Sequence, residues 1–309
     1  MQITNSILMI RPVGFRKNEQ TAVNNYFQED LDIKNAEINK KAQTEFDAFV
    51  TVLREKGVQV TVVDDTKSPD TPDSIFPNNW ISFHEDGTVG LYPMFAENRR
   101  NERREDIFEV LEEKGFVINN VVDYTSAEEE GFFLEGTGSI LLDRMHKKAY
   151  CALSDRADEE LFIEFCEDFD YFPVIFTANQ SVDGQRMPIY HTNVMMAMGE
   201  KFSIICADTI DDKKERKAVL EHLNNDGKEI IRITEKQMHQ FAGNMLQVLG
   251  SNDKRYLAMS SAAFNSLTED QIKKINNHCE IIHSSLDTIE TCGGGSARCM
   301  MAEVFLPKG

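Results

Sequence analysis

A cysteine near the end of the chain follows a run of three glycines, within residues 291–300 of sequence TCGGGSARCM. Consecutive glycines allow a mobile loop and a close approach of the backbone to another group. The apolar residues 300–306 then predict a buried strand. The thiol of Cys299 is therefore expected at the start of a strand, next to a loop that can open and close. A buried structural cysteine after a flexible turn explains the same residues, so the rest of the chain has to decide.

The elements that would position this cysteine repeat along the chain. A helical pattern over 40–56, ended by Gly57, precedes a β-branched strand over 58–63 and a hairpin over 79–92. The same order of helix, strand and hairpin recurs, and the last unit lacks one strand, which an N-terminal strand over 6–11 would supply. The sequence therefore predicts one α/β domain over residues 1–309, a ring closed by its N-terminal strand. The later helices are predicted over 105–114, 158–169, 213–224 and 269–278.

The first residues of the successive hairpins are spaced almost evenly along the chain. A repeat longer than the usual solenoid units indicates a closed, propeller-like ring, in which equivalent positions face one central channel. A thiol, an imidazole, a carboxylate and two amides would then meet in that channel. The five residues are Asn79, Glu135, His191, Asn244 and Cys299.

This set of side chains is suited to nucleophilic catalysis. A thiolate beside an imidazole is a nucleophile with its proton acceptor. Glu135 would orient His191 or bind a donor group of a substrate. The alternative for His191 is an ordinary core histidine beside the apolar run 194–198. A lone carboxylate in the apolar surroundings of Glu135 needs a partner, which favours the catalytic interpretation.

Composition and charge exclude several classes of protein. Hydrophobic residues make up 41% and charged residues 28% of the chain, as in globular proteins. The net charge of −19 argues against a nucleic-acid partner. No apolar run reaches the length of a membrane span and no basic leader is present, so a cytoplasmic protein without a membrane partner is expected. The six cysteines form no CxxC pair, and no metal site is predicted.

Four motifs together carry a resemblance to a known family. They are Phe76-Pro77-Asn78-Asn79, Leu134-Glu135-Gly136, His191-Thr192-Asn193 and the glycine loop that ends in Cys299. In this order the chain resembles the guanidino-group-modifying (pentein) superfamily, which includes arginine deiminase, dimethylarginine hydrolase and the amidinotransferases. The resemblance implies an α/β fold, a five-bladed pseudo-fivefold α/β propeller with a Cys-His-Glu/Asp site in its channel.

The resemblance also implies roles for individual residues. Cys299 matches the nucleophile, His191 the general acid/base and Glu135 the carboxylate that holds a substrate nitrogen. Arg156 matches an arginine that binds a substrate α-carboxylate, and Arg99 is a second candidate for that role. A bidentate arginine–carboxylate pair is the physical reason to expect them. A solvated start of a helix in the charged run 97–106 explains Arg99 equally well.

Two departures from the family pattern bear on the substrate. Arginine deiminases carry aspartates at the positions of Asn79 and Asn193, where the negative charges neutralise a guanidinium. Without them a buried cation would face Glu135 alone, which is costly. An amide both donates and accepts hydrogen bonds and suits a neutral ureido group. The sequence therefore predicts hydrolysis of L-citrulline to ornithine, carbon dioxide and ammonia through an S-carbamoyl-cysteine intermediate, as in the citrulline-utilisation hydrolases that it resembles.

Other functions stay open at this point. The substrate could be arginine or a substituted arginine, with Asp73 as a second carboxylate, as in a deiminase or a dimethylarginine hydrolase. An amidinotransferase and a non-catalytic propeller that serves as a binding module are further alternatives. In every enzymatic case the expected partner is a small ureido or guanidino amino acid, with no metal or organic cofactor, and a homo-oligomer is compatible with the sequence. The glycine loop and the segment 65–77 are the candidates for a lid.

Overall fold

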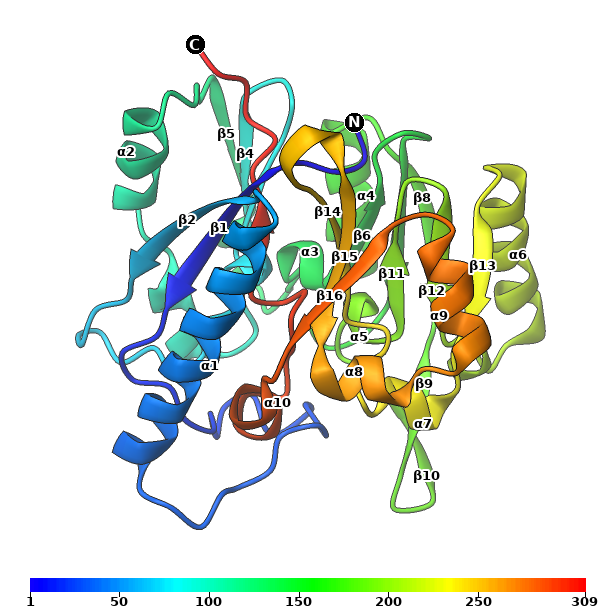
Figure 1. The fold of residues 1–309 in the computed structure, drawn as a ribbon, viewed down its shortest axis with the longest axis horizontal. Helices are drawn as coiled ribbons and strands as arrows, with labels where there is room; N and C mark the ends of the chain where they lie inside the picture. The colour runs from blue at the N-terminus through cyan, green and yellow to red at the C-terminus, as the bar shows by residue number, and fades with distance from the viewer.

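The computed structural model describes residues 1–309 as five three-stranded sheets and one two-stranded hairpin (Figure 1). In each three-stranded sheet the middle strand pairs antiparallel with one neighbour and parallel with the other. The sheets are β17-β1-β2, β3-β4-β5, β6-β7-β8, β11-β12-β13 and β14-β15-β16, and the hairpin is β9-β10. The strands are β1 Ser6–Arg11, β2 Gln59–Asp64, β3 Ile81–Phe83, β4 Thr88–Leu91, β5 Asn120–Asp123, β6 Ile140–Asp143, β7 Lys148–Ala152, β8 Phe172–Phe176, β9 Asn179–Val182, β10 Gln185–Pro188, β11 Met196–Met198, β12 Phe202–Ile205, β13 Glu229–Arg232, β14 Leu246–Leu249, β15 Arg255–Ser260, β16 Glu280–Ser284 and β17 Ala302–Glu303.

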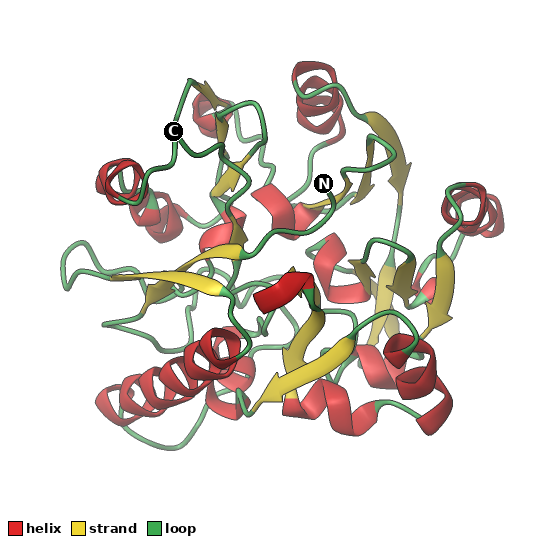
Figure 2. Ribbon diagram, turned by 45° about the horizontal axis from the view of Figure 1, so that its top comes forward, coloured by secondary structure: helices red, strands yellow, loops and turns green.

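A helix connects the two parallel strands of each three-stranded sheet, as parallel pairing requires. These helices lie around the outside of the molecule, with the strands inside them (Figure 2). Short helical turns precede several of the strands. The α-helices are α1 Asn35–Glu55, α2 Asp106–Glu113, α3 Gly136–Ser139, α4 Glu159–Asp168, α5 Thr192–Met195, α6 Lys213–Asn225, α7 Glu235–Met238, α8 Ser261–Ser266, α9 Glu269–Asn276 and α10 Asp287–Gly293; the 3₁₀ helices are η1 Pro77–Asn79, η2 Glu97–Glu102, η3 Thr125–Glu129, η4 Ala207–Thr209 and η5 Ser251–Asp253.

Local sequence explains where these elements begin and end. Helix α1 buries Phe46, Phe49 and Leu53 at helical spacing on one face. Gly57 adopts a φ of +86°, a left-handed conformation that terminates the helix and leads into the valine-rich strand β2. Helix α9 starts with a capping box, in which Thr268 and Gln271 exchange side-chain and backbone hydrogen bonds.

The apolar core is divided into four clusters, of which the largest contains 33 buried residues and the next 25. Each cluster combines residues of the sheets with residues of the outer helices. Buried polar and charged residues gather instead where short turns meet at the inner ends of the sheets. None of the helices combines the length and the apolar character that crossing a membrane would require.

The structure confirms the predicted mixed α/β class and the repeated order of elements. Strand β1 lies between β17 and β2, so the two ends of the chain meet in one sheet. The sheets are separate from one another and none is closed. The five-bladed propeller and the single domain over residues 1–309 therefore stay predictions.

Two details of the predicted elements are wrong. The buried strand expected over 300–306 is limited to Ala302–Glu303, because residues 298–301 form a turn in which the amide of Met301 donates to the carbonyl of Arg298. The hairpins expected to start at Glu135 and His191 begin with the short helices α3 and α5 before the strands. The predicted site residues thus lie on turns that precede strands rather than on the strands themselves.

Candidate active site

The short turns at the inner ends of the sheets bring the predicted site residues together. Asn79 ends η1, and Glu135 and His191 lie immediately before α3 and α5. Glu135 contacts His191 and Asn193 contacts Cys299, and both contacted residues line a single cavity. The cavity is lined by Asp73, Asn79, Arg99, Arg156, His191, Cys299 and the glycines 293–295. Asn244 contacts Cys299 as well, so all nine residues singled out in the sequence lie at or next to this cavity, and their catalytic roles stay predictions.

Glu135 and His191 form a fully buried pair. Nε2 of His191 lies 2.7 Å from Oε2 of Glu135, whose Oε1 accepts the amide of Phe95 at 3.0 Å. Burial alone would raise the pKa of Glu135, but Arg156, the His191 hydrogen bond and Arg99 together lower it to about 2. Burial lowers the pKa of His191 to about 4, and Glu135 offsets only part of this effect. At neutral pH a carboxylate thus accepts the Nε2–H of a neutral imidazole.

The thiol of Cys299 is surrounded by side-chain amides. Nδ2 of Asn193 lies 3.4 Å and Nδ2 of Asn244 lies 3.2 Å from the Sγ of Cys299. Oδ1 of Asn244 accepts the amide of Arg298, which fixes the orientation of that side chain. N–H groups that point at sulfur stabilise a thiolate. No hydrogen bond joins Cys299 to His191, although both line the cavity, so a bound substrate would lie between them.

Arg99 is buried and orients Asn79. Its guanidinium forms two hydrogen bonds of 2.9 Å with the carboxylate of Glu102. Nη1 of Arg99 donates to Oδ1 of Asn79 at 2.8 Å, and Nδ2 of Asn79 then donates to Asn78. Arg99 is only 2% exposed, so the alternative of a solvated helix start is wrong. Its position fits a residue that sets the direction of the Asn79 amide.

Arg156 lies near two aromatic rings in the wall of the cavity. Its guanidinium carbon is 5.0 Å from the ring centre of Tyr190 and 5.9 Å from that of Phe95. Nε donates to Oδ1 of Asn24 at 2.9 Å, and Nη2 donates to the carbonyl of Thr21. Its Nη1 remains directed toward Glu135 at 3.5 Å. The arginine is thus held in a fixed position beside the cavity, as a carboxylate-binding residue would need to be.

Asp73 has an unused acceptor inside the site. One oxygen, Oδ2, accepts hydrogen bonds from Asn18 at 2.8 Å and Thr21 at 3.1 Å. The other oxygen, Oδ1, is buried and has no hydrogen-bond partner. Burial raises the pKa of this carboxyl, although Arg99 and the hydrogen bonds oppose the shift. Because a buried carboxylate oxygen without a partner is costly, Asp73 is suited to a cationic or N–H donor of a ligand.

A segment that the sequence analysis did not identify closes the site. Residues 12–34 connect β1 to α1, and within them Thr21 and Asn25 line the cavity. Nε2 of Gln28 donates to the carbonyl of Gly293 at 3.1 Å, and Asn25 reaches the carbonyls of Gly293 and Gly294. The feature of the sequence that points to this segment is its length and its content of Asn and Gln, since long ordered loops are commonly functional. The segment 65–77 contributes Asp73 and Phe76 to the lining of the cavity, and its role as a lid stays a prediction.

Gly138 has no side chain, and Asn79 and His191 occupy the space where one would lie. A Cβ atom built on this residue would lie 2.5 Å from Nδ2 of Asn79 and 2.8 Å from Nδ1 of His191. Real Cβ atoms do not approach other atoms this closely, so any side chain at position 138 would displace both groups. Glycine at this position is therefore part of the construction of the site.

We expect Gly138→Ala to lower kcat at least tenfold, since a displacement of this size misplaces the reacting groups. Steady-state kinetics and a thermal melt of the variant would be compared with Gly14→Ala, whose Cβ would meet only Asp70 at 3.7 Å. An alanine at position 138 that leaves kcat unchanged would show that neither Asn79 nor His191 needs its observed position.

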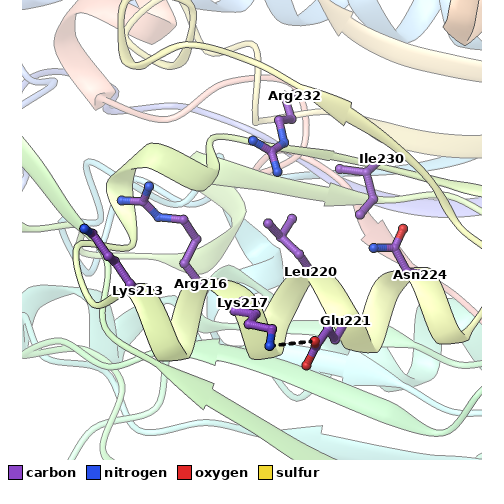
Figure 3. Close-up of a pocket in the computed structure, with 8 residues that line it drawn as sticks. All are labelled: Lys213, Arg216, Lys217, Leu220, Glu221, Asn224, Ile230 and Arg232. Carbon is purple, nitrogen blue, oxygen red and sulfur yellow. Dashed lines mark ion pairs between the residues drawn. The ribbon is translucent and has the colours of Figure 1, made fainter.

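A second, wider hollow lies away from this site. It has a volume of about 500 Å³, is open to solvent and lies between α6 and β13 (Figure 3). Lys213, Arg216, Lys217 and Arg232 give it a positive charge, and Leu220 and Ile230 form its apolar floor. It contains no cysteine and no histidine, so the thiol and imidazole of cysteine-dependent catalysis are absent from it. The chemistry therefore belongs to the narrower cavity around Cys299.

Several solved structures have the same fold as this chain. An apo arginine dihydrolase, ArgZ, from the ornithine-ammonia cycle in cyanobacteria is 17% identical, with a TM-score of 0.73 over 98% of this chain and 41% of that one. The protein AgrE, solved with L-arginine, is 16% identical with a TM-score of 0.73 over 98% and 40% of the two chains. A dimethylarginine dimethylaminohydrolase, solved as an adduct with S-methyl-L-thiocitrulline, is 15% identical with a TM-score of 0.65 over 98% and 100%.

The present chain thus spans about two fifths of the length of ArgZ and AgrE, and it covers 99% of the separately solved N-terminal domain of ArgZ. Comparison with curated proteins gave no match. The family model described as N,N dimethylarginine dimethylhydrolase, eukaryotic, matches residues 11–306. The chain therefore belongs to this family, within the guanidino-group-modifying (pentein) superfamily.

Proposed function

We propose that the protein is a cysteine-dependent hydrolase that removes the ureido group of L-citrulline and releases ornithine. The observation that carries this choice is the environment of Glu135. This carboxylate is the one next to His191, and it already lies 3.5 Å from Arg156, 3.8 Å from Arg99 and 2.7 Å from His191. A third cation beside two guanidinium groups would be repelled, whereas a neutral ureido group would not.

The amides around Cys299 support the same choice. Asn193 and Asn244 direct N–H groups at the sulfur, and Asn79 lines the same cavity with its oxygen bound to Arg99. A ureido oxygen accepts from such N–H groups, and ureido N–H groups donate to amide oxygens. Arg156 and the free oxygen of Asp73 would bind the α-carboxylate and α-ammonium ends of the amino acid, respectively.

The first chemical step forms a covalent intermediate. His191 accepts the thiol proton of Cys299, and the thiolate attacks the ureido carbon. Glu135 stabilises the imidazolium that results, at the 2.7 Å contact. The bond to the δ-nitrogen breaks, His191 gives its proton to that nitrogen, and ornithine leaves. Cys299 then carries an S-carbamoyl group.

Water completes the reaction. His191, again neutral, accepts a proton from a water molecule that attacks the carbamoyl carbon. The carbon–sulfur bond breaks, the thiol is regenerated, and carbamic acid separates into ammonia and carbon dioxide. Nδ2 of Asn193 or Asn79 would stabilise the developing oxyanion, and one such donor contributes roughly 3 kcal/mol in other enzymes.

Arginine or a methylated arginine is the second candidate, and the comparisons support it more directly than citrulline. The family description names dimethylarginine, and the solved structures include arginine dihydrolases. Within the site, the unpartnered Oδ1 of Asp73 is the observation in favour, since a carboxylate can pair with a guanidinium. An enzyme that converts arginine to ornithine would form a ureido compound on the way, in contact with the same side chains of the site.

The intermediate itself tests the proposal. The enzyme is mixed with L-citrulline, quenched in acid within milliseconds and digested for mass spectrometry. We expect the peptide that contains Cys299 to gain the mass of one carbamoyl group. A thiouronium adduct formed from L-arginine, with none from L-citrulline, would contradict the proposal in favour of the second candidate.

We expect Asn79→Asp to shift the substrate preference toward L-arginine. The aspartate can still accept the hydrogen bond from Arg99, but it loses the N–H and adds a negative charge that attracts a guanidinium. The ratio of kcat/KM for L-arginine to that for L-citrulline should rise roughly tenfold or more, equivalent to about 1.4 kcal/mol. An unchanged ratio, measured in a well-folded variant, would remove Asn79 from the selection of the substrate.

A further inference from the structure

A buried carboxylate outside the proposed chemistry links the two ends of the glycine loop. Glu290 belongs to α10 and is 5% exposed. Its Oε1 accepts the hydroxyl of Ser296 at 2.5 Å, across the loop formed by residues 293–295. Its backbone carbonyl accepts the amide of Gly294 at 2.9 Å. Glu290 and Ser296 therefore bracket the three glycines, one on each side.

The contact between Glu290 and Ser296 is connected both to the wall of the cavity and to the turn that carries Cys299. The three glycines line the cavity, and the carbonyls of the first two, Gly293 and Gly294, accept hydrogen bonds from Asn25, Gln28 and Tyr190. On the other side, the carbonyl of Ser296 accepts the amide of Cys299 at 3.0 Å. A change at the Ser296 hydroxyl would thus reach the wall of the cavity and the turn that carries the thiol.

We propose that Glu290 and Ser296 are positioning residues that hold the glycine loop in the closed arrangement around the substrate. Three consecutive glycines have little conformational preference of their own, so a fixed loop needs an external constraint. The side-chain hydrogen bond supplies that constraint from inside the protein, while Asn25 and Gln28 hold the loop from the side of residues 12–34. The inference rests on the proposed function only in that the cavity binds the substrate.

The surroundings of Glu290 determine which substitution is informative. Burial raises its pKa to about 7; the hydroxyls of Ser260 and Ser296 oppose this, and the negative charges of Asp287 and Glu45 add to it. The carboxyl is therefore partly neutral at neutral pH. A glutamine, which is always neutral and keeps an acceptor oxygen, is a close mimic that should retain the loop.

The test compares Ser296→Ala with wild type in steady-state kinetics and in alkylation by iodoacetamide. Loss of one buried hydrogen bond to a carboxyl should populate the open loop and raise KM roughly tenfold, with kcat changed less than about twofold. All six cysteines are buried, so faster alkylation of Cys299 in particular, mapped by mass spectrometry, would report the open loop. Cys166 and Cys279, away from the loop, should react as slowly as in wild type.

Control variants separate a positioning role from a general loss of stability. Ser203→Ala removes another buried hydroxyl donor, at 3.0 Å from the carbonyl of Ala197, and should change neither KM nor alkylation. Glu290→Ala should behave like Ser296→Ala, and Glu290→Gln like wild type. Unchanged KM and alkylation in Ser296→Ala, or equal losses in the Gln and Ala variants, would overturn the proposal. The alkylation result needs no substrate, so it stands even if the proposed function fails.

Discussion

Replacing Glu135 by glutamine should lower kcat by roughly 10²–10⁴-fold. A loss of this size is typical when a group that orients a catalytic base and stabilises its protonated form is removed. Glutamine has nearly the same shape, but it cannot stabilise an imidazolium on His191 at 2.7 Å. KM should change less, because the proposed contacts of Arg156 and Asp73 are with other parts of the substrate. Steady-state kinetics with L-citrulline and L-arginine would check this, and a kcat within threefold of wild type would contradict the assigned role.

The same variant should be markedly less stable. Glu135 compensates Arg156 and Arg99 in a fully buried site, and breaking such an arrangement costs about 3–5 kcal/mol. Urea unfolding curves would measure the loss. Glu280→Gln is the matched control, since its pairs with Lys56 and Lys254 lie at the surface and should contribute less than about 1 kcal/mol.

This stabilisation should depend on pH in a defined direction. The pKa of Glu135 falls from an ordinary value near 4.5 to about 2 on folding, so the unfolded chain binds its proton more readily than the folded one. The contribution, roughly 3 kcal/mol from this shift, is complete above about pH 5 and is lost as the pH falls toward 2. The difference in unfolding free energy between wild type and Glu135→Gln should therefore shrink on acidification. A difference that grows below pH 5 would contradict the assignment.

Replacing Cys299 by alanine should abolish turnover, with a loss of at least about 10⁴-fold, because no other thiol lines the cavity. Binding should survive, since Arg156, Asp73 and the glycine loop remain. A rise in melting temperature with added substrate would demonstrate that binding. Cys279→Ala, which removes a buried thiol elsewhere in the core, should keep its activity. Residual turnover in Cys299→Ala above about a hundredth of the wild-type rate would show that the thiol is not the nucleophile.

The sequence predicted the outer elements and the site residues for different physical reasons. Helix α1 and the valine-rich β2 follow from local periodicity and from the glycine between them, so they could be read directly. Glu135, His191 and Cys299 were found because one supersecondary unit recurs, and equivalent positions of a repeat meet in space. Their place on turns before the strands was missed, because the short helices α3 and α5 contain too few residues to show a helical period.

Long-range contacts account for what the sequence did not reveal. Thr21, Asn25 and Gln28 carry no motif, and their role depends on where residues 12–34 cross the cavity. The charged run around Arg99 is equally compatible with a solvated surface, and only the contacts with Glu102 and Asn79 show that this side chain is buried. Strand β17 is shorter than the sequence predicts, because Phe305 and Leu306 are buried without continuing the backbone pairing that the amide of Val304 makes with the carbonyl of Ser6.

The most direct test of the central claim is ornithine release from L-citrulline and from L-arginine by the wild-type enzyme, with both substrates at equal concentrations in separate assays. The crowding of Glu135 by Arg99, Arg156 and His191 predicts ornithine from L-citrulline at a kcat/KM well above that for L-arginine. Efficient ornithine or citrulline formation from L-arginine, with L-citrulline inert, would contradict selection of a neutral ureido group.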